Sequence, residues 1–318
     1  MIGGVKALVL TAIIPLLVAR VVGSGIDTRA GDAPSPTPSA QAQSVSAEAQ
    51  ADRVIIRVAG APFTEYIFPD DSKYPYFFPV LGPRSGTTVT VHKTEPYPHH
   101  SSIFFGCDRV NGGNYWQEGL DRGRIVSKSV RIIRDRGDRI EFEQDCDWER
   151  PGAESPFADD RRIAVSAPSA DVRFIDFDVT LTAQIDVKIE KTNHSLFSVR
   201  VAPELAVKAG GTLINATGDL AELGTFGKPA AWADYRGTRD GIVEGVAILS
   251  HPQNRWFPEP WFTRDYGFMS PTPMEWLPGG ELKLAKGEKL HLRYRAVVHA
   301  GAPSQTQLGQ WFEDWAKQ

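Results

Sequence analysis

The stretch RFIDFDVTLTAQ, residues 173–184, decides the fold because its apolar and polar side chains alternate. Successive side chains of a β-strand point to opposite faces, so this alternation predicts a strand with one face in a core. Asp176 and Asp178 share the opposite face. They either line a cleft as a carboxylate pair suited to acid/base chemistry or belong to an ordinary solvated strand face.

The same pattern recurs from residue 53 to the C-terminus, where Gly, Pro, Asn and Asp clusters separate more than ten such segments. Examples are RVIIRVAG (53–60), RIEFEQDCDW (139–148) and LHLRYRAVVH (290–299). Only SQTQLGQWFEDWAKQ (304–318) has the spacing of an amphipathic helix, and Ser304 is its expected N-cap. The sequence therefore predicts an all-β protein: one large antiparallel β-sandwich over residues 53–318 with a short C-terminal helix. Two smaller sandwiches are the alternative.

The N-terminus predicts export. One lysine precedes a 13-residue apolar run from Ala7 to Ala19, which is short for a membrane span and typical of a signal peptide. We assign residues 1–24 to a cleaved signal peptide, with an uncleaved anchor as the alternative, and expect a secreted or periplasmic protein. Residues 25–52 are rich in Ala, Ser, Pro and Gln and are expected to form a disordered linker. No later segment is apolar enough to span a membrane.

Charge and motifs exclude several function classes. The net charge of -4, with scattered Lys and Arg, does not favour nucleic acid as a partner. The sequence has no P-loop, Rossmann glycine fingerprint, HExxH, CxxC or nucleophile-elbow motif, so no cofactor is expected.

The two cysteines, Cys107 and Cys146, both lie in segments with a strand pattern. Export predicts a disulfide between them. Two buried thiols that act as small apolar groups are the alternative. No metal is expected at these positions, since close-spaced cysteine pairs are lacking.

The segment EPYPHHSSIFFGCDRVNGGNYWQEG, residues 95–119, concentrates polar and aromatic groups around an Asn-Gly-Gly turn. Amide and carboxylate groups suit the hydroxyls of a sugar, and an aromatic face stacks on its ring. A polar hairpin with one buried histidine is the alternative interpretation. The candidate residues here are His99, His100, Asn111, Trp116 and Glu118.

A second cluster follows in SHPQNRWFPEPWFTRDYGFMSP, residues 250–271. Its prolines, aromatics and charges do not fit a regular strand, which indicates a long structured loop of the kind that often carries function. Tight packing of its aromatic residues is the alternative. The candidate residues are His251, Asn254, Trp261, Arg264 and Tyr266, with Trp232 from the preceding AAWADYRG; His194 occupies an apparent turn, and His291 and His299 are expected to be structural.

The ordered motifs YPYFFPVLGPRSG (74–86), YPHHSS (97–102) and FGKPAAWADYRG (226–237) resemble the bacterial family labelled "PmoA-like" or "methane oxygenase PmoA" (DUF6807). The label implies an oxygenase, but a particulate methane monooxygenase subunit is an integral membrane protein and this chain has no spanning segment after residue 24, so we do not expect that activity. Many relatives carry Arg where this chain has Ser101 and His-Gly at Cys107, a departure that argues against a metal site here. A weaker similarity is to galactose-mutarotase-like supersandwich proteins, which implies a sugar cleft on one sheet served by histidines and carboxylates.

These observations lead to one hypothesis: an exported sandwich that acts on or recognises a carbohydrate. As an enzyme it would be a glycan hydrolase, lyase or epimerase, with His99 or His100, Glu118 and His251 as acid/base groups. Arg264 would hold a carboxylate or oxyanion, and Trp116, Trp261 and Tyr266 would form a stacking wall. The alternatives are a non-catalytic carbohydrate-binding module and a metal-dependent enzyme that uses His99, His100 and His251.

Overall fold

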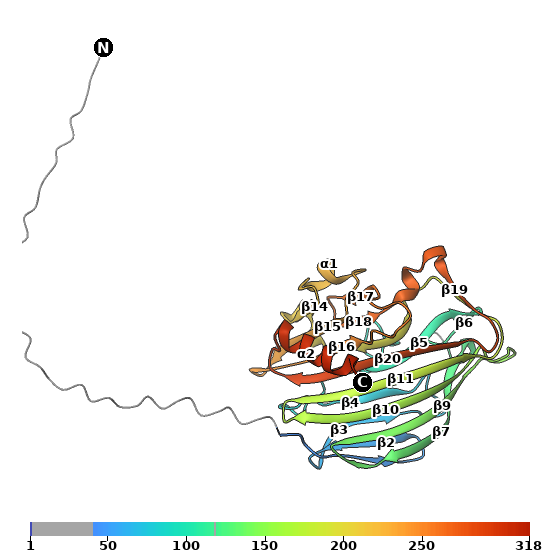
Figure 1. Cartoon of the computed structure of the whole chain (residues 1–318), viewed down its shortest axis with the longest axis horizontal. Coiled ribbons are helices and arrows are strands. Elements are labelled where there is room, and N and C mark those ends of the chain that lie inside the picture. Colours follow the sequence, from blue (N-terminus) through green and yellow to red (C-terminus); the bar gives the residue numbers. More distant parts are fainter. Residues whose placement is uncertain (2–40, 118) are drawn as a thin grey trace, which may run out of the picture. The chain divides into compact units, whose positions relative to one another are not determined.

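The computed structural model describes Met1, residues 41–117 and residues 119–318, and residues 40–318 form one compact unit (Figure 1). The predicted signal peptide, beyond Met1, and the linker up to residue 40 lie outside the described residues. The linker prediction is wrong for its last part, because Val45–Ala49 form strand β1. Val45 is buried in this strand, and the backbone of β1 pairs with β2. The backbone hydrogen bonds of this pairing stabilise β1, although its small side chains bury little apolar surface.

The described strands form two sheets in which every strand pair is antiparallel, which confirms the predicted all-β sandwich. The larger sheet has 12 strands: β1 (Val45–Ala49), β2 (Arg53–Val58), β3 (Ala61–Ile67), β4 (Tyr76–Val80), β5 (Ile103–Val110), β6 (Gly113–Asn114), β8 (Arg136–Gly137), β12 (Val187–Glu190), β13 (Ser195–Arg200), β17 (Trp261–Arg264), β18 (Phe268–Pro271) and β19 (Glu281–Leu284). The second sheet has 8 strands: β7 (Arg124–Arg134), β9 (Arg139–Glu149), β10 (Phe157–Ser169), β11 (Val172–Ala183), β14 (Thr212–Asn215), β15 (Trp232–Arg239), β16 (Ile242–Ser250) and β20 (Lys289–Ala300).

Helices are few and short among the described residues. The α-helices there are α1 (Ala221–Thr225) and α2 (Gln305–Ala316), and the 3₁₀ turns are Leu120–Arg122, Pro203–Leu205, Val207–Ala209, Pro273–Glu275 and Pro278–Gly280. The predicted C-terminal helix is confirmed, and the Ser304 hydroxyl caps it by accepting a bond from the Gln307 N–H at 3.1 Å. None of the helices in the described part of the chain is both long and apolar enough to cross a membrane.

Strand β11, which contains the alternating stretch, lies in the middle of the eight-stranded sheet between β10 and β20 (Figure 1). Its inward residues Ile175, Phe177 and Val179 are buried. The Phe177 ring packs 5.3 Å from that of Phe197 on β13, so the core fills the space between the two sheets. The opposite face of the eight-stranded sheet carries polar side chains and, over part of its area, helix α2.

The core contains an ion pair between Asp159 and Arg161, both on β10 and both fully buried. The Arg161 guanidinium donates to both carboxylate oxygens, at 2.7 and 3.0 Å, and to the Tyr66 hydroxyl of β3 at 3.0 Å. The Trp148 indole N–H donates to the same carboxylate at 2.7 Å. This pair therefore connects the two sheets through hydrogen bonds as well as apolar contact.

The predicted disulfide is wrong, because Cys107 and Cys146 are both free and buried. Cys107 lies on β5 of the larger sheet and Cys146 on β9 of the smaller one. Packed sheets stand about 10 Å apart, whereas the Cβ atoms of a disulfide must approach to about 4 Å. The two thiols are small buried groups of the core, and burial raises the pKa of each.

We expect Arg161→Met to lower the free energy of unfolding by about 3–5 kcal/mol, because it leaves the Asp159 carboxylate buried without its counter-charge. Arg131→Met is the matched control, since Arg131 is exposed and pairs with Glu143 at the surface, where the cost is below about 1 kcal/mol. Equilibrium unfolding in urea measures both. Equal losses for the two variants would contradict a special role for the buried pair.

Candidate functional site

The candidate site lies on the outer face of the twelve-stranded sheet, where β5 and β13 pair. On β5, Phe105 points into the core and packs against Phe177, so the alternate residues Phe104 and Asp108 point outward. Phe104 is covered by Tyr74 and Trp116, whose rings lie 4.8 and 4.7 Å away. The sequence around β5 thus folds back over its own strand and forms a layer on the outside of the sheet.

Gly106 is required for that layer. A Cβ at this position would stand 2.6 Å from the carbonyl oxygen of Tyr115, so any other residue would push the covering segment away. The Tyr115 N–H donates to the Cys107 carbonyl at 2.9 Å, and the Asn114 side chain accepts bonds from the backbone of Trp116 and of Gln117. These contacts fix Trp116 against the sheet.

The two adjacent histidines of the sequence lie over this layer. The Tyr74 hydroxyl donates to the carbonyl of His99 at 2.6 Å, which holds the backbone in place. The His100 ring is buried 4.4 Å from the ring of Phe268 on β18, whereas His99 lines a cleft. The two imidazoles themselves are 4.4 Å apart.

A third histidine, His194, joins them from the turn before β13. Its Nδ1 lies 3.2 Å from Oδ2 of the buried Asp108, and its ring lies 5.6 Å from that of His99. The local sequence pattern predicts only a turn at His194 and does not indicate a site there. Its neighbourhood depends on the pairing of β5 with β13, a contact between residues far apart in the chain that local patterns do not reveal.

Burial keeps the first two imidazoles neutral. Desolvation, followed by the nearby His194, lowers the pKa of His99 to about 4. Desolvation, followed by His99 and then Arg200, lowers the pKa of His100 to about 2. At neutral pH both rings can therefore accept a hydrogen bond or a proton.

Three buried polar atoms in this layer have no hydrogen-bond partner within residues 41–117 and 119–318: Nδ1 of His100, Oδ1 of Asp108 and Nε1 of Trp116. Buried groups of this kind are rare in folded proteins and cost about 1–3 kcal/mol each. The cleft beside this layer, which Trp116 and His99 line, has a volume of about 670 Å³. Its lining combines charged and polar side chains, among them Asp71, Lys73, Lys93, His99, Ser101 and Gln117.

The later loop contributes one of its predicted residues to this region. The Tyr266 ring stacks 4.4 Å from that of Tyr97, close to His100, and the Arg200 guanidinium lies 4.4 Å from the centre of the Tyr266 ring. Arg264 instead pairs with Glu222 at 2.7 Å and lies over the Phe262 ring, so it is not directed at the histidines.

Several predicted site residues have structural contacts. Trp261 is buried and its indole donates to the Ala230 carbonyl, and Trp232 packs in the cluster beneath helix α2. Asn111 bridges the backbone of Asp186 and Lys188. Trp116 is fully buried, so it forms the floor of the cleft and not an exposed stacking wall. Glu118 lies outside the described residues.

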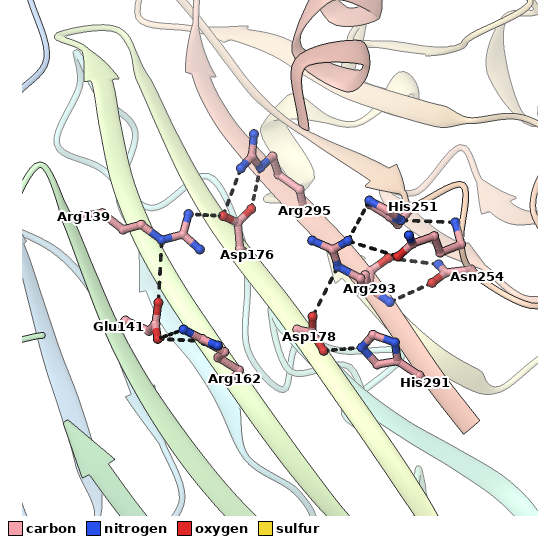
Figure 2. Close-up of polar contacts among 11 residues, drawn as sticks. Arg139, Glu141, Arg162, Asp176, Asp178, His251, Asn254, His291, Arg293 and Arg295 are labelled. Atoms are coloured by element: carbon pink, nitrogen blue, oxygen red, sulfur yellow. Dashed lines mark hydrogen bonds and ion pairs between the residues drawn. The ribbon is translucent and has the colours of Figure 1, made fainter. Parts of the chain in front are cut away.

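His251 and Asn254 lie on the outer face of the other sheet, where both contact Arg293 of β20 (Figure 2). The structure therefore does not bring these two predicted site residues together with His99 and His100. The metal hypothesis that joined His99, His100 and His251 is wrong for the same reason. In the described part of the chain, no group of three or more His, Cys, Asp or Glu side chains is arranged to hold a metal ion.

The family model described as "Family of unknown function (DUF6807)" matches residues 53–313. None of the curated proteins is similar in sequence. Among solved structures, a GH36 α-galactosidase (AgaA) from Geobacillus stearothermophilus is similar at 9% identity and a TM-score of 0.37, over 84% of this chain and 42% of that one. A putative aldose 1-epimerase from Escherichia coli K12 is similar at 12% identity and a TM-score of 0.31, over 81% of this chain and 99% of that one. This chain thus spans less than half the length of the galactosidase.

The low pKa of His100 predicts that the protein loses stability in acid. The unfolded chain protonates this ring below about pH 6.5, whereas the folded chain keeps it neutral down to about pH 2. Unfolding therefore takes up a proton between these values, and this group makes stability fall by about 1.4 kcal/mol per pH unit as the pH drops.

We expect the free energy of unfolding of the His100→Gln variant to fall less steeply between pH 6 and pH 4 than that of the parent protein. Urea unfolding at each pH measures this slope. His92, His99 and His251 also have lowered pKa values and remain in the variant, so part of the fall persists. Parallel curves for the parent and the variant would show that His100 is not the buried neutral group inferred here.

Proposed function

Because the chain belongs to the family of unknown function DUF6807, whose description names no activity, we propose its function from the cleft geometry: it acts on a carbohydrate by acid/base chemistry. The observation that carries the proposal is that His99, which lines the cleft, has its ring 5.6 Å from that of His194, whose Nδ1 lies 3.2 Å from Oδ2 of Asp108. Two ionisable groups within reach of one ligand are what proton transfer to and from a substrate requires.

The two histidines have different surroundings, which suits different roles. His99 is neutral at pH 7 because its pKa is lowered to about 4, so it serves as the proton acceptor. Asp108 accepts the bond from Nδ1 of His194 and orients that ring, so we assign the proton-donor role to His194. Such a pair fits an epimerase or lyase, which removes a proton from carbon, and also a hydrolase.

A carbohydrate is the substrate class that matches the lining. A sugar presents many hydroxyls that both donate and accept, and the cleft offers carboxylate, ammonium, hydroxyl and amide groups within about 670 Å³. This volume suits one or a few sugar units. We also propose export to the periplasm or the medium, on the basis of the apolar run from Ala7 to Ala19.

The alternative is a non-catalytic module that holds a sugar in the same cleft. The proposal of catalysis is supported over this alternative by the ionisable pair and the unpartnered buried atoms, because an open aromatic strip is the usual surface of a binding module. Of the predicted aromatic residues, Trp116 is buried, which weakens the stacking interpretation.

The test is turnover of a panel of oligosaccharides and polysaccharides by the mature protein, with product analysis. We expect His99→Ala and His194→Ala each to lower kcat by about 10²–10⁴-fold, because each removes one proton-transfer group. Asp108→Asn, which keeps the shape of the side chain, should lower kcat with little change in KM, because it acts on the orientation of His194. Glu118→Gln tests the remaining predicted acid/base residue.

The matched control is Lys283→Ala, an exposed side chain on β19 of the same sheet that pairs with Glu281. It should keep full activity. Binding of a saccharide that survives in the His99 and His194 variants, with no turnover by the parent protein, would favour the binding module. Full activity of both histidine variants would refute the site assignment.

A further inference from the structure

A second polar cluster occupies the outer face of the eight-stranded sheet, where charged side chains of β9, β10, β11 and β20 point toward one another (Figure 2). The register aligns them in rows across the sheet. One row contains Glu141, Ala164, Asp176 and Arg295, and the next contains Glu143, Arg162, Asp178 and Arg293. Strands β9, β10 and β11 follow one another in the chain, whereas β20 comes from a distant part of the sequence.

The two rows surround a pocket, which Glu141, Arg162 and Asp176 help to line. In the register Ala164 lies between Glu141 and Asp176, two residues after Arg162 on the same strand. The pocket at this place has a volume of about 360 Å³, large enough for one sugar unit. Trp315 from the end of α2 lines it on one side.

The charges of the pocket are arranged in two layers. Glu141 and Asp176 form the base, with side chains only 13% and 12% exposed, and each binds an arginine. Arg139, Arg162 and His291 form the rim, with side chains 36%, 61% and 48% exposed. A ligand that approaches from solvent therefore meets cationic and hydrogen-bond-donor groups first.

The base carboxylates hold the arginines in fixed directions. Glu141 accepts bonds from Nε and Nη2 of Arg162, which leaves the Nη1 edge of that guanidinium pointing away from it. Asp176 binds Nη1 of Arg139 at 2.7 Å and Nη2 of Arg295 at 2.9 Å. Oriented guanidiniums bind a planar carboxylate with two parallel hydrogen bonds better than mobile ones do.

A third carboxylate lies at one end of the pocket. Asp178 binds Nε2 of His291 at 2.6 Å and Nε of Arg293 at 3.2 Å. Arg293 is held in turn by His251, whose Nε2 lies 2.9 Å from its Nη1, and by the side chain of Asn254, which accepts from its backbone N–H (Figure 2). Asp178 is about one-third exposed, so it remains available as a hydrogen-bond acceptor.

We propose that this pocket binds a carboxylate-bearing sugar unit, a uronate. The sugar carboxylate would bind the rim guanidiniums of Arg139 and Arg162, and its hydroxyls would bind Asp178 and His291. A simple anion fits less well because the three carboxylates of the pocket would repel it without any compensating hydrogen bonds. A neutral sugar would leave the rim guanidiniums without an anionic partner. The site is separate from the histidine cleft and does not depend on the function proposed there.

Isothermal titration calorimetry of the mature protein tests this proposal with four probes: D-glucuronate, D-galacturonate, D-glucose and acetate. We expect at least one uronate to bind about tenfold or more tightly than both glucose and acetate, because only a uronate presents a carboxylate and hydroxyls together. Its affinity should fall as NaCl is raised.

Arg139→Gln and Arg162→Gln should each weaken the uronate about tenfold. The matched control is Arg131→Gln, an exposed arginine on β7 that pairs with Glu143 and is not part of the pocket, and it should leave the affinity unchanged. His99→Ala, in the histidine cleft, should also leave it unchanged, which separates this site from the proposed carbohydrate cleft.

Three results would overturn the proposal. Equal affinity for glucuronate, galacturonate and glucose would remove the role of the carboxylate. Acetate binding as tightly as the uronates would reduce the pocket to a site for small anions. Loss of uronate binding in His99→Ala with full binding in both arginine variants would transfer the uronate to the histidine cleft.

Discussion

The structure depends on the buried ion pair between Asp159 and Arg161, because this pair and its hydrogen-bond partners form a polar link between the two sheets within a largely apolar core. The Arg161 guanidinium lies 5.8 and 5.6 Å from the ring centres of Phe105 and Phe177, which belong to opposite sheets. Its bond to the Tyr66 hydroxyl continues to Gln144, since that hydroxyl donates to the amide oxygen at 2.6 Å. A desolvated ion pair is tolerated only when all of its partners are present, so these contacts favour a single alignment of the sheets.

That alignment also determines what the two outer faces present. A shift of one residue in β10 or β11 would turn Arg161 outward and bring Asp176 into the core, where it would have no partner. The same holds on the larger sheet. Because Phe105 of β5 points into the core, Asp108 of the same strand points outward, where it contacts His194. Both candidate sites therefore follow from how the core is packed, although neither lies in it.

Local sequence patterns predicted the strands, the C-terminal helix and the shared face of Asp176 and Asp178, because alternation and helical spacing are properties of short segments. They could not tell which of two sheets a strand joins. For this reason the sequence predicts a common role for His251 and His99 and a disulfide between Cys107 and Cys146, although each pair is divided between the sheets. Strand β1 was missed because its small residues lack an apolar stripe, and its stability comes from backbone pairing with β2. His194 was missed because its partner Asp108 is supplied by a distant strand.

The two outer faces differ in how their polar groups are satisfied, and this difference bears on function. On the eight-stranded sheet the carboxylates are paired with arginines, so a ligand there adds bonds to an organised surface. On the twelve-stranded sheet, buried atoms of His100, Asp108 and Trp116 are left without partners among the described residues. Packing alone favours replacing such groups by apolar ones, since each costs about 1–3 kcal/mol. Trp116 and the neighbouring His99 also line the open cleft, so these unsatisfied groups belong to the layer where we propose that a carbohydrate binds.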